Sequence, residues 1–197
     1  MKGKNESIIK RNFFERNPDI VAKELLGKKF IRKIGNKTLS GIIVETEAYF
    51  GENDPASRAY KRKSKLFHKK MSSKAGTLLI YVVHNNYLLN IISHKENEVG
   101  AVLIRAVEPI EGIEIMKKNR GKEKIEDLSS GPGKFTKCFC IDKKFDGIDI
   151  TKSKNEIYIL NTENKNFEIK SSKRIGVKTD LKRNLRFFIS GNKFISK

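Results

Sequence analysis

The chain has 197 residues, a length typical of one domain with its own core, and 42 Lys and Arg against 23 Asp and Glu give a formal net charge of +19. This surplus favours a polyanionic partner, nucleic acid before an anionic membrane, although an AT-rich coding bias also enriches lysine. The sequence has no run of 18 apolar residues and no apolar signal core near Met1, which excludes a membrane-spanning helix, and we expect a cytoplasmic protein.

The first predicted element is a helix between Asn17 and Gly27. Asn17, Pro18 and Asp19 have the chemistry of an N-cap, a first helical residue and an acid that suits the helix dipole, and Gly27 is a typical C-cap. The apolar residues between them recur at helical spacing. We expect residues 1–14, which precede this helix, to form a flexible segment.

Most of the chain after this helix has the pattern of strands joined by short polar turns, and a second helix is predicted over residues 108–119, where apolar residues recur every three positions. Short hairpin connections, with the helices set apart, indicate an α+β fold with a largely antiparallel sheet in one domain that spans residues 15–197. The predicted strands cover residues 29–33, 39–45, 77–83, 87–93, 101–107, 157–160, 167–170, 174–177 and 185–189.

The sequence offers few ligands for a structural metal. Cys138 and Cys140 are only two residues apart, too close for an ordinary disulfide, and no second Cys or His cluster completes a zinc site. His68, His84 and His94 have neither metal-ligand nor catalytic-triad spacing. We therefore expect reduced, packed cysteines, no metal and no cofactor.

Three carboxylates follow the apolar run Gly41 to Val44. If that strand continues, alternation places Glu45 and Glu47 on one face, about 7 Å apart. With Asp54 they could hold Mg²⁺, as in a metal-dependent nuclease. They could equally be solvated residues at a sheet edge, and the pattern alone does not separate the two interpretations.

Tyr49, Tyr81 and Tyr87 stand at or near predicted strand ends. Their rings can stack on nucleobases there, or they can pack at the edge of the core with the hydroxyl in solvent. The segment "LSSGPGKFTK" (128–137) is superficially similar to a phosphate-binding loop. It lacks the first glycine and the Ser or Thr after Lys134, so a nucleoside triphosphatase is not indicated. A contact between this turn and a DNA phosphate stays open.

Several blocks together resemble one family, the alkyladenine (3-methyladenine) DNA glycosylases. The most specific combination is "VETEAY" (44–49), "IRAVEP" (104–109) and "SGPGKF" (130–135). Further blocks occur in the family's order and extend the resemblance over most of the chain: "AGTLLIYVV" (75–83), "LLNIIS" (88–93), "FDGIDI" (145–150), "RIGV" (174–177) and "LRFFI" (185–189). The resemblance implies a single compact α+β domain, with helices around a curved antiparallel sheet.

The resemblance also implies a function. A base inside a duplex is out of reach, so such an enzyme flips the damaged purine into a pocket, and water displaces the base from the sugar. By the resemblance, Glu47 is the general base that activates this water, and Arg105 and the backbone carbonyl of Ile175 help to hold it. Glu45 becomes a supporting residue, and no lysine nucleophile, strand cleavage or metal is implied.

The implied base pocket has Tyr49 and Tyr81 on opposite sides, with Asn90 where a side chain clashes with the exocyclic amine of guanine. One departure is Arg58, which stands where most members of the family carry a histidine. A guanidinium stacks on a base, but its fixed charge disfavours a cationic lesion relative to a neutral one. The lesion preference is therefore left open.

A second departure is the hairpin tip, where the family inserts a tyrosine into the gap that the flipped nucleotide leaves. This chain is one residue short there, and His84 aligns best as the wedge, with Tyr87 as the second candidate. A histidine ring is smaller and more polar than the tyrosine ring of the family. It therefore compensates less of the free-energy cost of unstacking, which is a few kcal/mol. Slower excision from well-paired sites is the expected consequence.

The expected partner is double-stranded DNA with damaged purines, bound by a monomer that associates with a prokaryotic nucleoid and not with a membrane. The alternatives from other classes are a basic nucleic-acid-binding module with an inactive pocket and the metal-dependent nuclease described above. The predicted contacts to DNA phosphates, besides Arg58, are Lys61, Arg62, Lys63, Lys65, Lys134 and Lys137.

Overall fold

A computed structural model describes residues 7–152, 155–162 and 166–196, and its fold is organised around one long strand, β3 (Lys37–Phe50). Along one side β3 pairs with β6 (Gly100–Glu111). Along the other side it pairs first with β2 (Lys29–Ile34) and then, at residues 45–47, with β9 (Arg186–Ile189). Because β3 changes partner at its middle, Glu45 and Glu47 lie between β6 on one side and β9 on the other.

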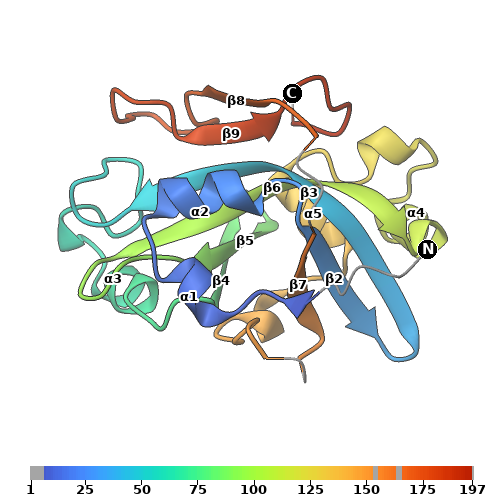
Figure 1. Cartoon of the computed structure of the whole chain (residues 1–197), viewed down its shortest axis with the longest axis horizontal. Helices are drawn as coiled ribbons and strands as arrows, with labels where there is room; N and C mark the ends of the chain where they lie inside the picture. The colour runs from blue at the N-terminus through green and yellow to red at the C-terminus, as the bar shows by residue number, and fades with distance from the viewer. Residues whose placement is uncertain (1–6, 153–154, 163–165, 197) are drawn as a thin grey trace.

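The strands of the described residues form one antiparallel sheet in the order β1-β7-β2-β3-β6-β5-β4, which β9 joins through β3 and β8 joins through β9. In Figure 1 the β8–β9 pair lies above the other strands. This arrangement confirms the predicted α+β fold with an antiparallel sheet in a single compact domain. The remaining strands are β1 (Ser7–Ile8), β4 (Leu78–Val83), β5 (Asn86–Ile92), β7 (Ile157–Asn161) and β8 (Ile169–Ser172).

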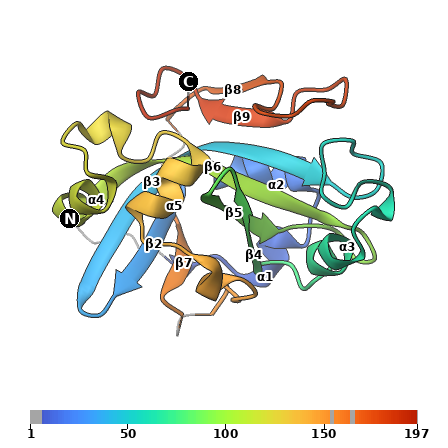
Figure 2. The same ribbon diagram turned by 180° about the vertical axis from the view of Figure 1, so that it is seen from behind.

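Two helices cover opposite faces of the sheet. The helix α2 (Pro18–Leu25) packs on β3 and β6 and faces the viewer in Figure 1, whereas α5 (Pro132–Cys138) packs on β5 and β6 and faces the viewer in Figure 2. The inner sides of both helices are apolar and fully buried. The other helical segments are α1 (Arg11–Phe14), α3 (Lys65–Met71), α4 (Ile113–Arg120) and the short 3₁₀ turns Tyr60–Arg62, Ile125–Asp127 and Lys143–Phe145.

None of these described helices has the length and apolar character that crossing a bilayer requires. The predicted helix after Asn17 is confirmed, and Gly27 follows its end with a left-handed φ of 81°. Residues 7–14, part of the segment expected to be flexible, belong to the fold instead. They form β1 and α1, and the Phe14 side chain is fully buried in the core. Residues 1–6 of that segment lie outside the described residues.

The hairpin between β4 and β5 is tighter than the sequence suggested. Its two central residues, His84 and Asn85, have φ values of 46° and 61°, and Asn86 already begins β5. A two-residue turn with both φ values positive matches the right-handed twist of the flanking strands. The histidine is therefore held at the hairpin tip by the geometry of the turn.

The predicted helix over residues 108–119 is wrong in its first part. Residues 108–111 continue β6 and pair with β3, and the helix begins only at Ile113, after Gly112 with its left-handed φ of 78°. The strands approach closely here, since a Cβ at Gly41 would lie 2.5 Å from the carbonyl oxygen of Glu108. The pairing of this segment with β3 therefore overrides the helical spacing of its apolar residues.

The predicted strand over residues 174–177 is also wrong, because these residues form a loop. The backbone N–H of Arg174 donates to Asp180 and the N–H of Ile175 donates to Glu47. Carboxylates thus take the hydrogen-bonding groups that a sheet partner would need. The loop instead brings a backbone donor to the middle of β3.

Candidate active site

The carboxylate of Glu47 has no exposed surface, and Glu47 reaches the cavity described below only through its partners, which line it. Its Oε1 accepts the N–H of Ile175 at 2.8 Å and lies 3.2 Å from Nη1 of Arg105. Its Oε2 accepts the hydroxyl of Tyr49 at 2.8 Å. Three donors from different parts of the chain therefore fix both carboxylate oxygens.

These partners also change the pKa of the Glu47 carboxyl group. Burial raises the pKa of Glu47 above its ordinary value, although the charge of Arg105 and the hydrogen bonds from Ile175 and Tyr49 oppose this effect. A carboxylate has about four lone-pair sites, of which three are used here, so one stays available for a water molecule. A raised pKa and one free acceptor site are the properties that a general base requires.

Glu45 lies on the same face of β3 but in a different environment. The two glutamates share Arg105, whose Nε is 2.8 Å from Oε1 of Glu45. Glu45 also accepts Nε of Arg186 at 2.6 Å and both the N–H and the hydroxyl of Ser196. A register shift of β3 against β6 occurs on each side of Glu45, and such bulges re-aim side chains.

A second buried cluster supports the other end of the site. Arg174 donates to both oxygens of Asp54, at 2.7 and 2.6 Å, and to Asp180 at 2.6 Å. Its guanidinium carbon lies 4.5 Å from the ring centre of Tyr49. Burial alone would lower the pKa of Arg174, but the hydrogen bonds to Asp54 and Asp180 raise it. The loop after β8 and the Tyr49 ring are thereby held together.

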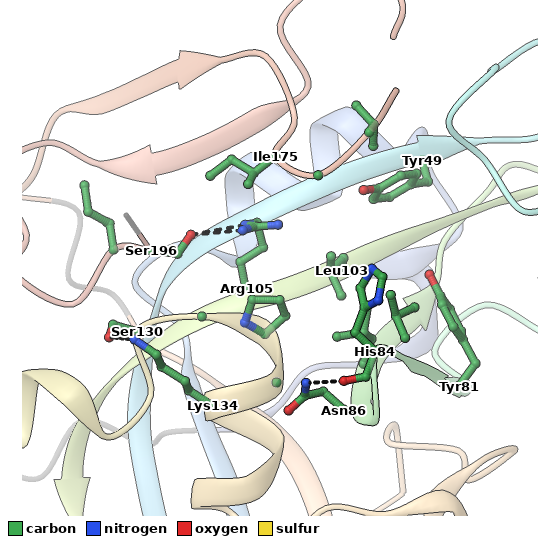
Figure 3. Close-up of a pocket in the computed structure, with 18 of the residues that line it drawn as sticks. Tyr49, Tyr81, His84, Asn86, Leu103, Arg105, Ser130, Lys134, Ile175 and Ser196 are labelled. Atoms are coloured by element: carbon green, nitrogen blue, oxygen red, sulfur yellow. Dashed lines mark hydrogen bonds between the residues drawn. The ribbon is translucent and has the colours of Figure 1, made fainter. Parts of the chain in front are cut away.

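The cavity beside Glu47 has a volume of about 980 Å³, at the upper end of ordinary ligand sites. Figure 3 shows Tyr49 and Ile175 above the cavity, Arg105 on its wall and Tyr81 on its far side. The predicted residues that line it are Tyr49, Arg58, Tyr81, His84, Arg105, Lys134 and Ile175. Residues far apart in the sequence are therefore brought to one space.

Asn90 does not line this cavity but a separate small recess, whose lining includes Tyr49, Arg58 and Tyr81 as well. Burial raises the pKa of the Tyr81 hydroxyl, against the charge and hydrogen bond of Arg58. The exposed guanidinium of Arg58 lies 5.3 Å from the Tyr81 ring centre and 5.7 Å from that of Phe67. A fixed cation thus lies on one of the two aromatic walls.

The two wedge candidates occupy different positions. His84 is exposed, lines the cavity and projects from the hairpin tip into the space between Arg105 and Tyr81 (Figure 3). The Tyr87 side chain packs against the main core, and its carbonyl oxygen accepts the hydroxyl of Thr136. The position of His84 favours it over Tyr87.

Among the predicted phosphate contacts apart from Arg58, Lys134 alone lines the cavity. The other five are exposed, and the structure places them away from its lining. Arg62 pairs with Glu52, while Lys61 and Lys63 lie over the ring of Tyr60. Lys65 begins α3 and Lys137 lies near the end of α5.

The three carboxylates of the nuclease hypothesis do not gather around one point. Glu45 and Asp54 are bound to different arginine clusters, and Glu47 accepts a backbone N–H and a tyrosine hydroxyl in place of a metal. Within residues 7–152, 155–162 and 166–196, no group of three His, Cys, Asp or Glu residues has a metal-binding arrangement. The interpretation of Glu45 and Glu47 as solvated edge residues is wrong, because both side chains are fully buried.

Ile175 contacts Glu47 through its backbone N–H, whereas the resemblance implies a role for its carbonyl. The functional neighbours that sequence reasoning missed are Arg174, Asp180, Arg186 and Ser196. No local motif marks them, because their partners are distant: Arg174 is 120 residues from Asp54. Of the two cysteines, Cys138 is buried as expected, but Cys140 is exposed.

Comparisons with known proteins show the family of the chain. The model of the methylpurine-DNA glycosylase (MPG) family matches residues 12–193. Three relatives carry the name "Putative 3-methyladenine DNA glycosylase". That of Clostridium perfringens (strain 13 / Type A) is 42% identical and the alignment covers 95% of this chain and 98% of the relative. Those of Staphylococcus saprophyticus and Aeropyrum pernix are 38% and 33% identical, over 94% and 96% of this chain and 92% and 93% of their own lengths. The chain therefore belongs to the methylpurine-DNA glycosylase family, and it is a DNA glycosylase, a hydrolase of DNA repair.

Proposed function

We propose that this glycosylase releases alkylated or deaminated purines from double-stranded DNA by attack of a water molecule that Glu47 activates. The substrate class comprises 3-methyladenine, 7-methylguanine, hypoxanthine and ethenoadenine. The observation that carries the proposal is the buried Glu47 carboxylate beside an aromatic-walled cavity, with one acceptor site left after Ile175, Arg105 and Tyr49 are bound.

The geometry supports a flipped base in this cavity. A base that leaves the duplex loses its stacking, and the rings of Tyr49 and Tyr81 offer replacement faces. His84 stands at the hairpin tip as the side chain that fills the vacated stack. Lys134 at the rim supplies positive charge for the phosphate backbone.

The catalytic step then follows from the charges beside Glu47. As the bond between base and sugar breaks, positive charge develops on the sugar, and the carboxylate of Glu47 both stabilises this charge and accepts a proton from the attacking water. Arg105 holds one carboxylate oxygen in place at 3.2 Å. The lysines that line the cavity, Lys124, Lys134 and Lys193, are exposed and are not used as nucleophiles.

The test is release of free base from duplexes that carry hypoxanthine, ethenoadenine or a methylated purine. In EDTA we expect free base and a strand that stays intact at the abasic site until it is treated with alkali. A requirement for Mg²⁺ would instead support the nuclease hypothesis, and borohydride trapping of a covalent complex would show a lysine nucleophile. Binding without any release would identify a DNA-binding module with an inactive pocket.

A further inference from the structure

The segment of residues 193–196 forms part of the cavity wall, about 90 residues along the chain from Arg105. Lys193, Ile195 and Ser196 line the cavity, and Phe194 packs against the core. Asn192, just before them, donates to Glu108 at 2.7 Å and accepts the N–H of Phe194 at 2.9 Å. The segment is thus anchored just before the point where it reaches the site.

The last contact of this segment is with Glu45. The N–H of Ser196 donates to Oε2 at 2.6 Å and its hydroxyl to Oε1 at 2.7 Å, while Nε of Arg105 and Nε of Arg186 donate to Oε1. Three of these four donors converge on Oε1 and one binds Oε2. Glu45 is therefore bound by one donor more than Glu47, and three of its donors hold the oxygen that Arg105 contacts.

Arg105 connects the two glutamates. Its Nε faces Glu45, its Nη2 donates to the Ser196 hydroxyl at 3.1 Å, and its Nη1 faces Glu47. A guanidinium is planar and carries its donors in a rigid fork. When Glu45 and Ser196 hold one edge of this fork, the direction of Nη1 is fixed as well (Figure 3).

We propose that Glu45 and Ser196 are positioning residues for base release, because they orient Arg105 so that Nη1 stays on Glu47. This inference rests on the proposed role of Glu47. Neither residue touches the base, and both act through Arg105. The segment of residues 193–196 is then a part of the catalytic architecture, and the fold brings it there through its contact with β3.

The charge of Glu45 gives this inference a readout that a purely structural role does not have. The groups that face Glu47 are Tyr49 and Glu45 from β3, Arg105 from β6, Arg186 across the β9 pairing and the Ile175 N–H from the loop next to Arg174. Among them the negative charge of Glu45 raises the pKa of Glu47. Removing this charge alone lowers that pKa, but the opposite effect of Arg105 on the pKa is larger. If Glu45 positions Arg105, its removal therefore raises the pKa of Glu47, and the acidic limb of the rate–pH profile moves to higher pH. A shift to lower pH would show that Arg105 stays in place without Glu45.

The experiment measures single-turnover release of hypoxanthine and, separately, binding of the same duplex, for Ser196→Ala, Glu45→Gln and the wild type. We expect Ser196→Ala to slow release about threefold to tenfold with binding within twofold. We expect Glu45→Gln to slow release more and to shift the acidic limb to higher pH, because Arg105 no longer stays on Glu47. Ser196→Thr, which keeps the hydroxyl, restores most of the rate. Ser190→Ala makes the same chemical change outside this network and serves as the matched control.

The outcomes separate this inference from the proposed function. If the wild type releases base, but folded Ser196→Ala and Glu45→Gln match it in rate and pH midpoint, the positioning role is wrong and the role of Glu47 stands. If Glu45→Gln does not fold, the test rests on Ser196→Ala. A rate of Ser196→Ala equal to that of Ser190→Ala would then contradict the positioning role. If the wild type releases no base, the proposed function and the inference fail together.

Discussion

The inner wall of the cavity and its rim are built from different kinds of side chain. The inner wall, Tyr49 and Arg105 with Glu47 directly behind them, is held at short distances by buried partners from β6, β9 and the loop after β8. The rim, Arg58, His84 and Lys134, is exposed and rests on surface loops, a hairpin tip and one helix start. From this difference we expect that the wall holds the reacting groups, for which little movement is tolerated, and that the rim adapts to the DNA and selects the base.

The largest effect should come from the wall, at Glu47. The substitution Glu47→Gln keeps the shape and an acceptor for Ile175 but removes the base, and we expect release of hypoxanthine to fall by about 10²–10⁴-fold. Binding of the lesion duplex should change little. Single-turnover kinetics and titration of a labelled duplex measure the two quantities.

The pH dependence of the wild type tests the same group. Burial raises the pKa of Glu47, and the ionised form is the active base. The rate should therefore fall as the pH drops through this raised pKa, at a higher pH than an ordinary glutamate would give. A rate of Glu47→Gln equal to that of the wild type would contradict the assignment of the base.

The second prediction concerns the support behind the wall. Replacing Arg174 with Met leaves Asp54 buried without its main partner and removes the cation from behind Tyr49. Loss of one partner of a buried ion pair lowers the free energy of unfolding by about 3–5 kcal/mol. Arg62→Met is the control, because Arg62 forms an exposed pair with Glu52 whose loss costs at most about 1 kcal/mol. Urea unfolding measures both, and equal losses would show that the Arg174 cluster does not support the site.

The sequence predicted much of the wall and little of its support. Strand alternation placed Glu45 and Glu47 on one face, and the structure confirms this through their shared Arg105. The resemblance selected Glu47 from the pair, although the bonding pattern that separates the two glutamates depends on Ser196, 151 residues from Glu45. Periodicity reports which face is buried, but it contains no information on which distant chain segment arrives there.

The same reason explains the errors in the fold. Residues 108–111 have helical spacing, yet their pairing with β3 holds them in a strand. Residues 174–177 are apolar enough for a strand, yet two carboxylates take the N–H groups of Arg174 and Ile175. In both segments a long-range partner overrides a local preference. The strands with short hairpin connections, β2 with β3 and β4 with β5, were predicted well because their partners are near in sequence.

The third prediction moves to the rim, where Arg58 lies on the Tyr81 wall. The bases of 3-methyladenine and 7-methylguanine are cationic, whereas hypoxanthine and ethenoadenine are neutral. Two unit charges at about 4 Å interact by about 1 kcal/mol in water and about 4 kcal/mol at an effective dielectric constant of 20. Since Arg58 is exposed, we expect the repulsion near the lower value, which still favours the neutral bases.

The substitution Arg58→Gln should therefore raise the rate of 7-methylguanine release relative to hypoxanthine release about fivefold, and Arg58→Lys, which keeps the charge, should leave the ratio near that of the wild type. Comparing the ratio between variants cancels the intrinsic lability of each glycosidic bond. The measurement is free-base release from duplexes of identical sequence. An equal ratio in all three proteins would show that the charge of Arg58 does not select the base.

The smallest effect is expected at the hairpin tip. His84→Ala removes the plug, so base release should slow about threefold from a well-paired hypoxanthine site and hardly at all from a mismatched site, where less stacking and pairing is lost on flipping. Tyr87→Leu is the matched test of the other candidate. Because the Tyr87 side chain packs against the core, this change should lower stability without altering the ratio between paired and mismatched sites. A change of that ratio in Tyr87→Leu alone would make Tyr87 the wedge and would require the hairpin to rearrange on DNA, since the present turn directs His84 and not Tyr87 into the cavity.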